Sequence, residues 1–371
     1  MKGVNTMVNK IFFSQNLFLW NKNDNHRKMP WKNEKDPYKI WISEIILQQT
    51  RVQQGLNYYE RFIAAFPDVH ALANAETEKV YKLWEGLGYY TRCKNLIASA
   101  KYISENLKGI FPATYKDILA LKGIGPYTAS AIGSFAFNLP HAVLDGNVFR
   151  VLSRFFGEEI PINTTEGKKF YGELAQKLLD KKNPGIYNQA IMDFGATICK
   201  PLLPLCFQCP LKKRCVAFLK KRVDELPVNN KVIKIKNRYF NYLVFELDNK
   251  YYVRKRTEKD IWQGLYEFVL RETASFPEHE DLVRDEILYP LLGKLDYQLI
   301  CISKEFVQQL THQKIRAKFY RIKILQPLVI DESYILATTD NIQELPFPKI
   351  IASLLIGGRI SLDLANEWEK K

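Results

Sequence analysis

The stretch LKGIGPYTASAI at residues 121–132 decides the fold, and LDGN follows at 144–147. Two glycines bracket Ile124, and Pro126 stands where a helix would begin, which suits proline because the first helical N–H has no partner. Apolar residues then recur at helical spacing, so we predict a helix, a glycine-rich hairpin and a second helix near 116–136. Glycines let a ligand approach the backbone, and a helix N-terminus attracts anions. The stretch therefore favours a phosphate-binding hairpin.

An acidic residue, Asp145, follows this hairpin. Taken separately, the hairpin is more readily explained as a tight turn between two helices and Asp145 as an ordinary helix N-cap. Their combination in one stretch is much more specific, and it organises the rest of the interpretation.

The composition is that of a soluble globular protein, with 371 residues, 47% hydrophobic and 25% charged. This length predicts two domains. The formal net charge of +14 favours a polyanionic partner, which charge alone leaves open between DNA, RNA and an anionic membrane surface. No apolar run approaches the ~20 residues of a membrane span, so we expect no membrane partner.

The spacing of apolar residues changes near residue 226 from a helical pattern to one that includes strands, which predicts two domains. The region 1–225 reads as all-α, a basic linker occupies 226–238, and 239–371 reads as α+β. Helices are expected at 9–22, 57–67, 78–84, 92–106, 147–156, 166–181, 186–199, 279–292 and 349–356. Strands are expected at 239–247, 251–255 and 316–324.

Four of the six cysteines form a cluster: Cys199, Cys206, Cys209 and Cys215. One tight pair with wider flanking gaps suits an iron–sulfur cubane, whereas zinc sites usually offer two tight pairs. Ligand type alone leaves both metals open. The basic triplet at 212–214 could bind phosphate, although such triplets are usually solvated.

The hairpin with Asp145 and the cysteine spacing resemble the helix-hairpin-helix Gly/Pro-Asp DNA glycosylases that carry an iron–sulfur cluster. SEIILQQT at 43–50, MPW at 29–31 and LGYY at 87–90 further resemble the MutY-type adenine DNA glycosylases. The resemblance implies a [4Fe–4S] cluster on the four cysteines of a 199–215 loop. It also implies a monomer that acts on double-stranded DNA with A:8-oxoguanine or A:G mispairs, in a bacterial-type cytoplasm near the nucleoid.

By this resemblance, Glu44 is the general acid that protonates adenine, and Asp145 stabilises the cationic sugar or captures it covalently. Glu44 borders an apolar helix face, where desolvation would raise its pKa toward neutrality. A helix start would keep the pKa of Asp145 low. Tyr127 stands where lyase relatives carry a Schiff-base lysine, which predicts a monofunctional enzyme. Tyr127 and Asn147 are expected to hydrogen-bond around the sugar and Asp145.

The remaining site residues are expected to contact DNA. A flipped base leaves a gap that a wedge must fill, and the resemblance assigns that wedge to Gln49 and Tyr89. Phosphate contacts are expected from Gly123, Gly125 and Lys122, a strand contact from Arg27, and a wall of the adenine pocket from Trp31.

In the C-terminal domain, IWQGLYEF at 261–268 resembles the Nudix-like domain of this family. The Glu-rich helix of a working Nudix pyrophosphatase is missing, so we expect no such hydrolysis. The resemblance implies that residues 310–312 recognise 8-oxoguanine. The recognition loop of the family usually reads Phe-Ser-His, and this chain has Leu310-Thr311-His312 at that position. Thr311 retains a hydroxyl, whereas Leu310 lacks the aromatic ring.

Two other functions agree with part of the sequence. A bifunctional glycosylase/lyase acting on oxidised pyrimidines disagrees with Tyr127 and with the extra domain. A non-catalytic DNA-binding protein with a structural cluster would need neither Glu44 nor Asp145.

Overall fold

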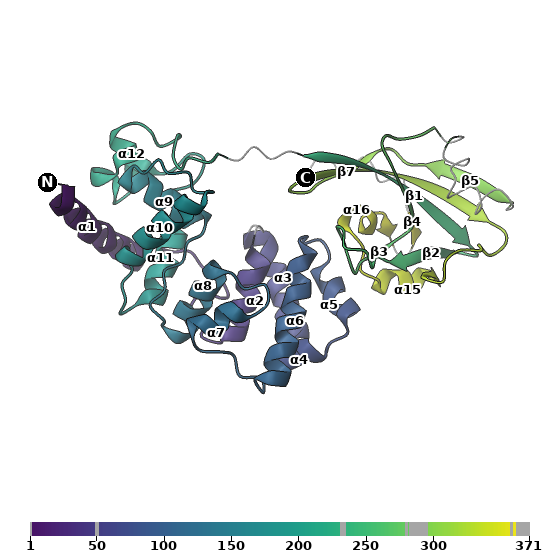
Figure 1. The fold of residues 1–371 in the computed structure, drawn as a ribbon, viewed down its shortest axis with the longest axis horizontal. Helices are drawn as coiled ribbons and strands as arrows, with labels where there is room; N and C mark the ends of the chain where they lie inside the picture. Colours follow the sequence, from purple (N-terminus) through teal and green to yellow (C-terminus); the bar gives the residue numbers. More distant parts are fainter. Residues whose placement is uncertain are drawn as a thin grey trace. The chain divides into compact units, whose positions relative to one another are not determined.

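A computed structural model of the chain describes residues 2–48, 52–230, 235–278, 281, 296–356, 359 and 360. Figure 1 shows its helices and strands along the chain. Its contacts divide the chain into two compact units, Met1–Asn74 with Lys94–Lys231, and Ala75–Cys93 with Val232–Lys371. The short segment Ala75–Cys93 thus groups with the second unit although it precedes the hairpin. Within the described ranges, no helix is long and apolar enough to cross a membrane.

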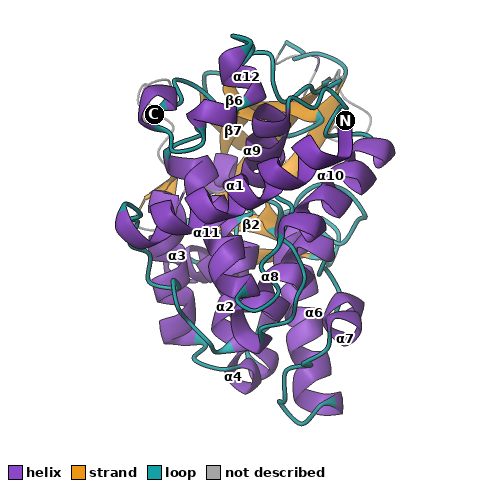
Figure 2. Cartoon of the chain, turned by 90° about the vertical axis from the view of Figure 1, so that its left-hand side faces the viewer, coloured by secondary structure: helices purple, strands orange, loops and turns teal. Residues whose placement is uncertain are grey.

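The first unit is built from helices, drawn in purple in Figure 2. They are α1 (Lys2–Asn23), α2 (Pro37–Leu47), α3 (Val52–Ala65), α4 (Val69–Asn74), α6 (Tyr90–Asn106), α7 (Tyr115–Ala120), α8 (Pro126–Phe137), α9 (Gly146–Phe156), α10 (Thr165–Leu178), α11 (Pro184–Thr197) and α12 (Val216–Leu219), with 3-10 turns η1 (Cys206–Gln208) and η2 (Lys212–Arg214).

Local sequence explains where the helices of the site begin. Asp36 caps α2 by accepting a hydrogen bond from the Tyr38 N–H at 2.9 Å, with proline in the first position. Gly125 precedes the first residue of α8, and Asp145 caps α9. The turn between α7 and α8 needs glycine at Gly123, whose φ is +82°. The predicted helix, hairpin and helix near 116–136 are therefore present as α7, the turn and α8.

The core of this unit lies between α1, α9 and α11. Phe13 of α1 packs on Phe155 of α9 with ring centroids 4.9 Å apart, and Trp20 packs edge-on to Phe194 of α11 at 5.0 Å. Burying such rings supplies much of the hydrophobic stabilisation. The packing holds α9, whose start carries Asp145 and Asn147, against α11.

The second unit contains α5 (Thr77–Trp84) and a mixed sheet. Its strands are β1 (Lys236–Leu247), β2 (Lys250–Lys255), β3 (Tyr266–Glu267), β4 (Val269–Thr273), β5 (Tyr297–Ile302), β6 (Phe306–Gln309), β7 (Gln313–Ile324) and β8 (Tyr334–Ala337). Its other elements are α15 (Thr339–Glu344), α16 (Lys349–Ala352), and the paired strands β9 (Leu355–Ile356) and β10 (Arg359–Ile360).

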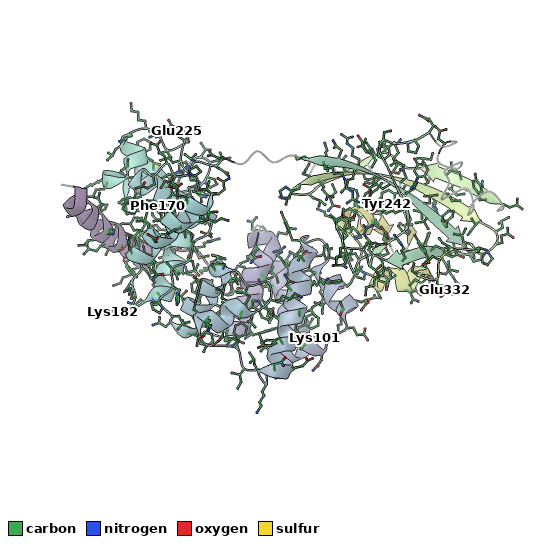
Figure 3. All side chains as sticks on the ribbon, in the orientation of Figure 1. Lys101, Phe170, Lys182, Glu225, Tyr242 and Glu332 are labelled. Atoms are coloured by element: carbon green, nitrogen blue, oxygen red, sulfur yellow. The ribbon has the colours of Figure 1, made fainter. Side chains whose placement is uncertain are left out.

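The sheet runs in the order β3-β2-β1-β7-β5, with β4 on β1, β6 on β7 and β8 on β2. The pair β1–β7 is parallel and the other pairs are antiparallel. Tyr242, labelled in Figure 3, is buried in this unit and stacks on Phe319 with ring centroids 5.1 Å apart. The helix expected at 349–356 ends at Ala352. The helix expected at 279–292 lies outside the described residues, apart from residue 281.

Candidate active site

One cavity of about 680 Å³ in the first unit collects the four predicted catalytic residues and four of the predicted DNA contacts. Its walls come from the hairpin, α2, the start of α9, α11 and the segment after α1. The predicted residues in its lining are Arg27, Trp31, Glu44, Gly123, Gly125, Tyr127, Asp145 and Asn147. Residues from across some 120 positions of sequence thus meet at one place because the helices pack around it.

Glu44 on α2 is only 7% exposed. The Tyr127 hydroxyl donates a hydrogen bond to Glu44 Oε2 at 2.6 Å. Burial raises the pKa of Glu44 to about 7, opposed by the Tyr127 hydrogen bond and assisted by the negative charge of Asp145. The predicted rise toward neutrality is confirmed. Tyr127 bonds to Glu44 here, and its expected hydrogen bond around the reacting sugar and Asp145 stays a prediction.

Asp145 is held at the N-terminus of α9. Its Oδ1 accepts from the Val148 N–H at 2.8 Å, and its Oδ2 accepts from Asn147 Nδ2 at 2.7 Å. Burial nevertheless raises the pKa of Asp145, and these hydrogen bonds oppose the rise without reversing it. The expectation that the helix start keeps this pKa low was wrong, because desolvation outweighs the capping interactions.

Arg150 links the site to the cysteine loop, and sequence reasoning did not identify it. Its guanidinium donates to Asn147 Oδ1 at 2.8 Å, to the Gly195 carbonyl at 2.7 Å and to the Cys199 carbonyl at 2.7 Å. Arg150 lies one helical turn after Gly146 on α9, so its spacing was the available signal. The arrangement fixes Asn147 beside Asp145.

A second, smaller cavity of about 100 Å³ shares Trp31, Glu44 and Gln189 with the first. Lys32 and Ile40 also line it. Trp31 is buried and packs edge-on to Tyr59 at 5.4 Å. Glu44 thus lines both cavities, and Lys32 and Gln189 are lining residues that the sequence did not single out.

The four cysteines Cys199, Cys206, Cys209 and Cys215 line one apolar hollow, together with Arg154. Arg154 Nη1 lies 3.6 Å from Cys199 Sγ and donates to the Lys200 carbonyl at 2.7 Å. Burial raises the pKa of Cys209 to about 12 and that of Cys215 to about 11, so a cation is needed to hold them as thiolates. Within the described ranges, no three Cys, His, Asp or Glu side chains converge on a point that fits one metal ion.

The proposed DNA contacts divide between several environments. Lys122 is exposed, and its carbonyl accepts from Ser99 Oγ at 2.9 Å. Arg27 instead donates to the carboxylate of Asp193 at 2.8 Å. Gln49 lies outside the described residues.

In the second unit, Tyr89 is 47% exposed and its backbone is left-handed, with φ +49°. Its hydroxyl lies 3.2 Å from Thr311 Oγ1 in the loop between β6 and β7. The His312 carbonyl in the same loop accepts from the Lys236 N–H at 3.0 Å. The structure thus brings Tyr89 and Thr311 together, although they are far apart in sequence.

Two family descriptions match the chain: HhH-GPD superfamily base excision DNA repair protein over residues 42–181, and NUDIX domain over 241–356. An adenine DNA glycosylase of Buchnera aphidicola subsp. Baizongia pistaciae is 38% identical over 306 residues, covering 81% of this chain and 83% of the relative. The chain belongs to the adenine DNA glycosylase family. It is a DNA glycosylase of base excision repair, and its substrate is DNA.

Other relatives agree. The adenine DNA glycosylase of Buchnera aphidicola subsp. Acyrthosiphon pisum is 36% identical over 261 residues, covering 70% of this chain and 75% of the relative. A thermostable thymine-DNA glycosylase structure is 29% identical with a TM-score of 0.54, covering 58% of this chain and 99% of that one. The predicted fold, an all-α helix-hairpin-helix glycosylase domain followed by an α+β Nudix-like domain, is confirmed.

Proposed function

We propose that this adenine DNA glycosylase removes adenine paired with 8-oxoguanine or guanine, and that it leaves an abasic site without cutting the strand. The observation that carries the proposal is the meeting of Glu44, Tyr127 and Asp145 in one cavity, with two carboxylates in different environments. Breaking an N-glycosidic bond requires a proton for the leaving base and a negative charge near the cationic sugar, which two such carboxylates supply.

Glu44 is the proton donor. Its pKa of about 7 keeps a substantial protonated fraction near neutral pH. Tyr127 donates to Oε2, which leaves Oε1 as the oxygen that carries the proton toward the flipped base. The surrounding pocket, with Trp31 and Gln189 in its wall, holds the base once it has left the stack.

Asp145 stabilises the sugar as positive charge develops on it. The hydrogen bonds from the Val148 N–H and the Asn147 amide favour the carboxylate anion and fix its orientation. Arg150 holds Asn147 in turn. The anion is therefore in place before the substrate arrives, as electrostatic preorganisation requires.

The absence of lyase chemistry follows from Tyr127. A phenol cannot form a Schiff base with the sugar, and burial raises the pKa of Tyr127 well above its ordinary value, so it stays a neutral hydrogen-bond donor. Lys122 occupies a different position in the hairpin and remains an exposed candidate for phosphate contact. Gly123 and Gly125 beside it let the DNA backbone approach.

A [4Fe–4S] cluster suits the cysteine loop. Cys199, Cys206, Cys209 and Cys215 would hold it, since all four line one apolar hollow. When bound, the cluster supplies four iron–sulfur bonds that tie the loop 199–215 together. Arg150 and Arg154 then anchor that loop to α9.

The C-terminal region, proposed as a domain over 239–371 after a basic linker, reads the base opposite adenine. The Tyr89 and Thr311 hydroxyls, 3.2 Å apart in the second unit, form a polar pair that suits the oxidised edge of 8-oxoguanine. Tyr89 and Gln49 are proposed as the wedge that fills the gap left by the flipped base. His312 is proposed as a further DNA contact. Residues 1–225 are proposed as the catalytic domain, and the protein is proposed to act as a monomer.

The test uses duplex oligonucleotides with adenine opposite 8-oxoguanine, guanine or thymine. Adenine release is expected opposite the first two, with strand breaks only after alkali. Breaks without alkali would favour the glycosylase/lyase alternative, and no adenine release from any duplex would exclude the proposal. DNA affinity should fall steeply with salt, because phosphate contacts release counterions.

A further inference from the structure

Asp193 is a buried carboxylate in α11 that the mechanism above does not use. It is 0% exposed, and it lies in an otherwise apolar stretch of the helix. Four side chains donate to it. They are Arg27 at 2.8 Å and Gln189 at 3.0 Å on Oδ1, and Asn25 at 3.0 Å and Lys32 at 3.2 Å on Oδ2. A buried carboxylate with four donors organises its surroundings, because its removal leaves four half-buried side chains without their acceptor.

Three of the four donors belong to residues 24–36, which contain no helix or strand. This segment lines the catalytic pocket with Met29 and Trp31. The segment has only isolated backbone hydrogen bonds, such as Lys32 N–H to the Met29 carbonyl, and three of its side chains meet at Asp193. Gln189, one helical turn before Asp193, lines both cavities as well.

Asp193 also affects the charges around Glu44. Glu44 shares its cavities with charged or titratable side chains from three sources: Tyr127 on α8, Asp145 at the start of α9, and Arg27, Lys32, Glu34 and Lys35 of the segment. Of these, Arg27 and Lys32 are cations paired with Asp193. An unpaired cation near a buried carboxyl would favour its ionised form.

We propose that Asp193 is a positioning residue for base excision, which holds segment 24–36 in the pocket wall and keeps the cations of Arg27 and Lys32 paired away from Glu44. The catalytic part rests on the proposed role of Glu44 as the acid. The anchoring part rests on the hydrogen bonds alone. Loss of the Asp193 charge would loosen the wall and leave Arg27 and Lys32 without this partner in cavities that Glu44 also lines.

The decisive variant is Asp193→Asn in the full chain with its metal content intact. We expect the rate of adenine release to fall as the pH rises and Glu44 loses its proton, and we call this fall the alkaline limb. In the variant the alkaline limb should move down by about one pH unit. The single-turnover rate should therefore stay within about twofold at pH 5.5 and fall about tenfold at pH 8. Adding Lys32→Gln should return that limb toward the position seen with Lys32→Gln alone. Asp24→Asn, an exposed acid on the same segment, is the matched control and should leave the limb unchanged.

Hydrogen–deuterium exchange provides a readout that needs no substrate. Peptides covering 24–36 should exchange at least about fivefold faster in Asp193→Asn, while peptides from α9 keep their rates. Equal acceleration in all peptides, or none in 24–36, would overturn the anchoring role. A rate loss that is the same at every pH would overturn the electrostatic role. A wild-type protein that releases no adenine would instead refute the proposed function, and the exchange result would still decide the anchor.

Discussion

Replacing Glu44 with glutamine separates the chemistry of this residue from its effect on stability. Glu44→Gln retains the side-chain volume and an oxygen that accepts from Tyr127, but it removes the acidic proton. Base release should therefore fall by about 10²- to 10⁴-fold, the usual worth of a general acid. The same change should stabilise the protein, and more strongly as the pH rises.

The magnitude follows from the pKa. Burial raises the pKa of Glu44 from 4.5 to about 7, so the folded protein holds this proton more tightly than the unfolded chain. Its contribution to stability is fully present below about pH 4.5 and is lost as the pH rises through 7. One pKa unit corresponds to about 1.4 kcal/mol. Relative to a side chain that does not ionise, the raised pKa therefore lowers the free energy of unfolding by about 1 kcal/mol at pH 5 and by about 3 kcal/mol at pH 8. The amide does not ionise and avoids this loss.

The assay is the melting temperature of the helical unit at both pH values. For a domain of roughly 150–250 residues, 1 kcal/mol shifts Tm by about 2–4 °C, so Glu44→Gln should raise Tm by about 2–4 °C at pH 5 and by about 6–12 °C at pH 8. Glu60→Gln, on the exposed side of α3, is the control and should show no pH-dependent difference. An equal Tm change at both pH values would refute the reasoning that burial raises this pKa.

Asp145→Asn should slow base release by about 10²- to 10³-fold while duplex binding is retained, because the variant loses the anion that faces the sugar; unchanged single-turnover rates would contradict that role. Gly123→Ala should lower Tm, since φ is +82° and a Cβ would lie 2.6 Å from Asn95 Cβ. Gly125→Ala, with no atom within 4 Å of its Cβ, should retain Tm and weaken DNA binding. If melting and binding titrations gave the reverse pattern, the structural role of Gly123 and the DNA-contact role of Gly125 would both be contradicted. Cys209→Ser should lose iron and visible absorbance in elemental analysis and spectroscopy, and a full iron complement would rule out the cluster assignment. Thr311→Ala should reduce the preference for 8-oxoguanine over guanine by about 2- to 10-fold, the worth of one hydrogen bond; an unchanged ratio of rates would exclude Thr311 from recognition.

The sequence determined the elements because their signals are local. Pro126 after a glycine marks the start of α8, and Asp145 marks the start of α9, since capping and backbone freedom depend on a few neighbouring residues. Apolar periodicity likewise predicted the longer helices of the first unit and the long strands β1 and β7, whereas the short helices α4 and α12 were not predicted. The family resemblance then supplied the roles of Glu44 and Asp145.

Tertiary structure decided what those side chains experience. Burial raised the pKa of Asp145 where the local helix start suggested the opposite, because desolvation depends on every chain segment around the carboxylate. The partners of Asp193 come from residues up to 168 positions away, and Tyr89 meets Thr311 across 222 positions. No local pattern encodes such meetings. The hairpin could be predicted from its own residues, whereas the burial and hydrogen-bond partners of Glu44, Asp145 and Asp193 depend on packing between segments distant in sequence.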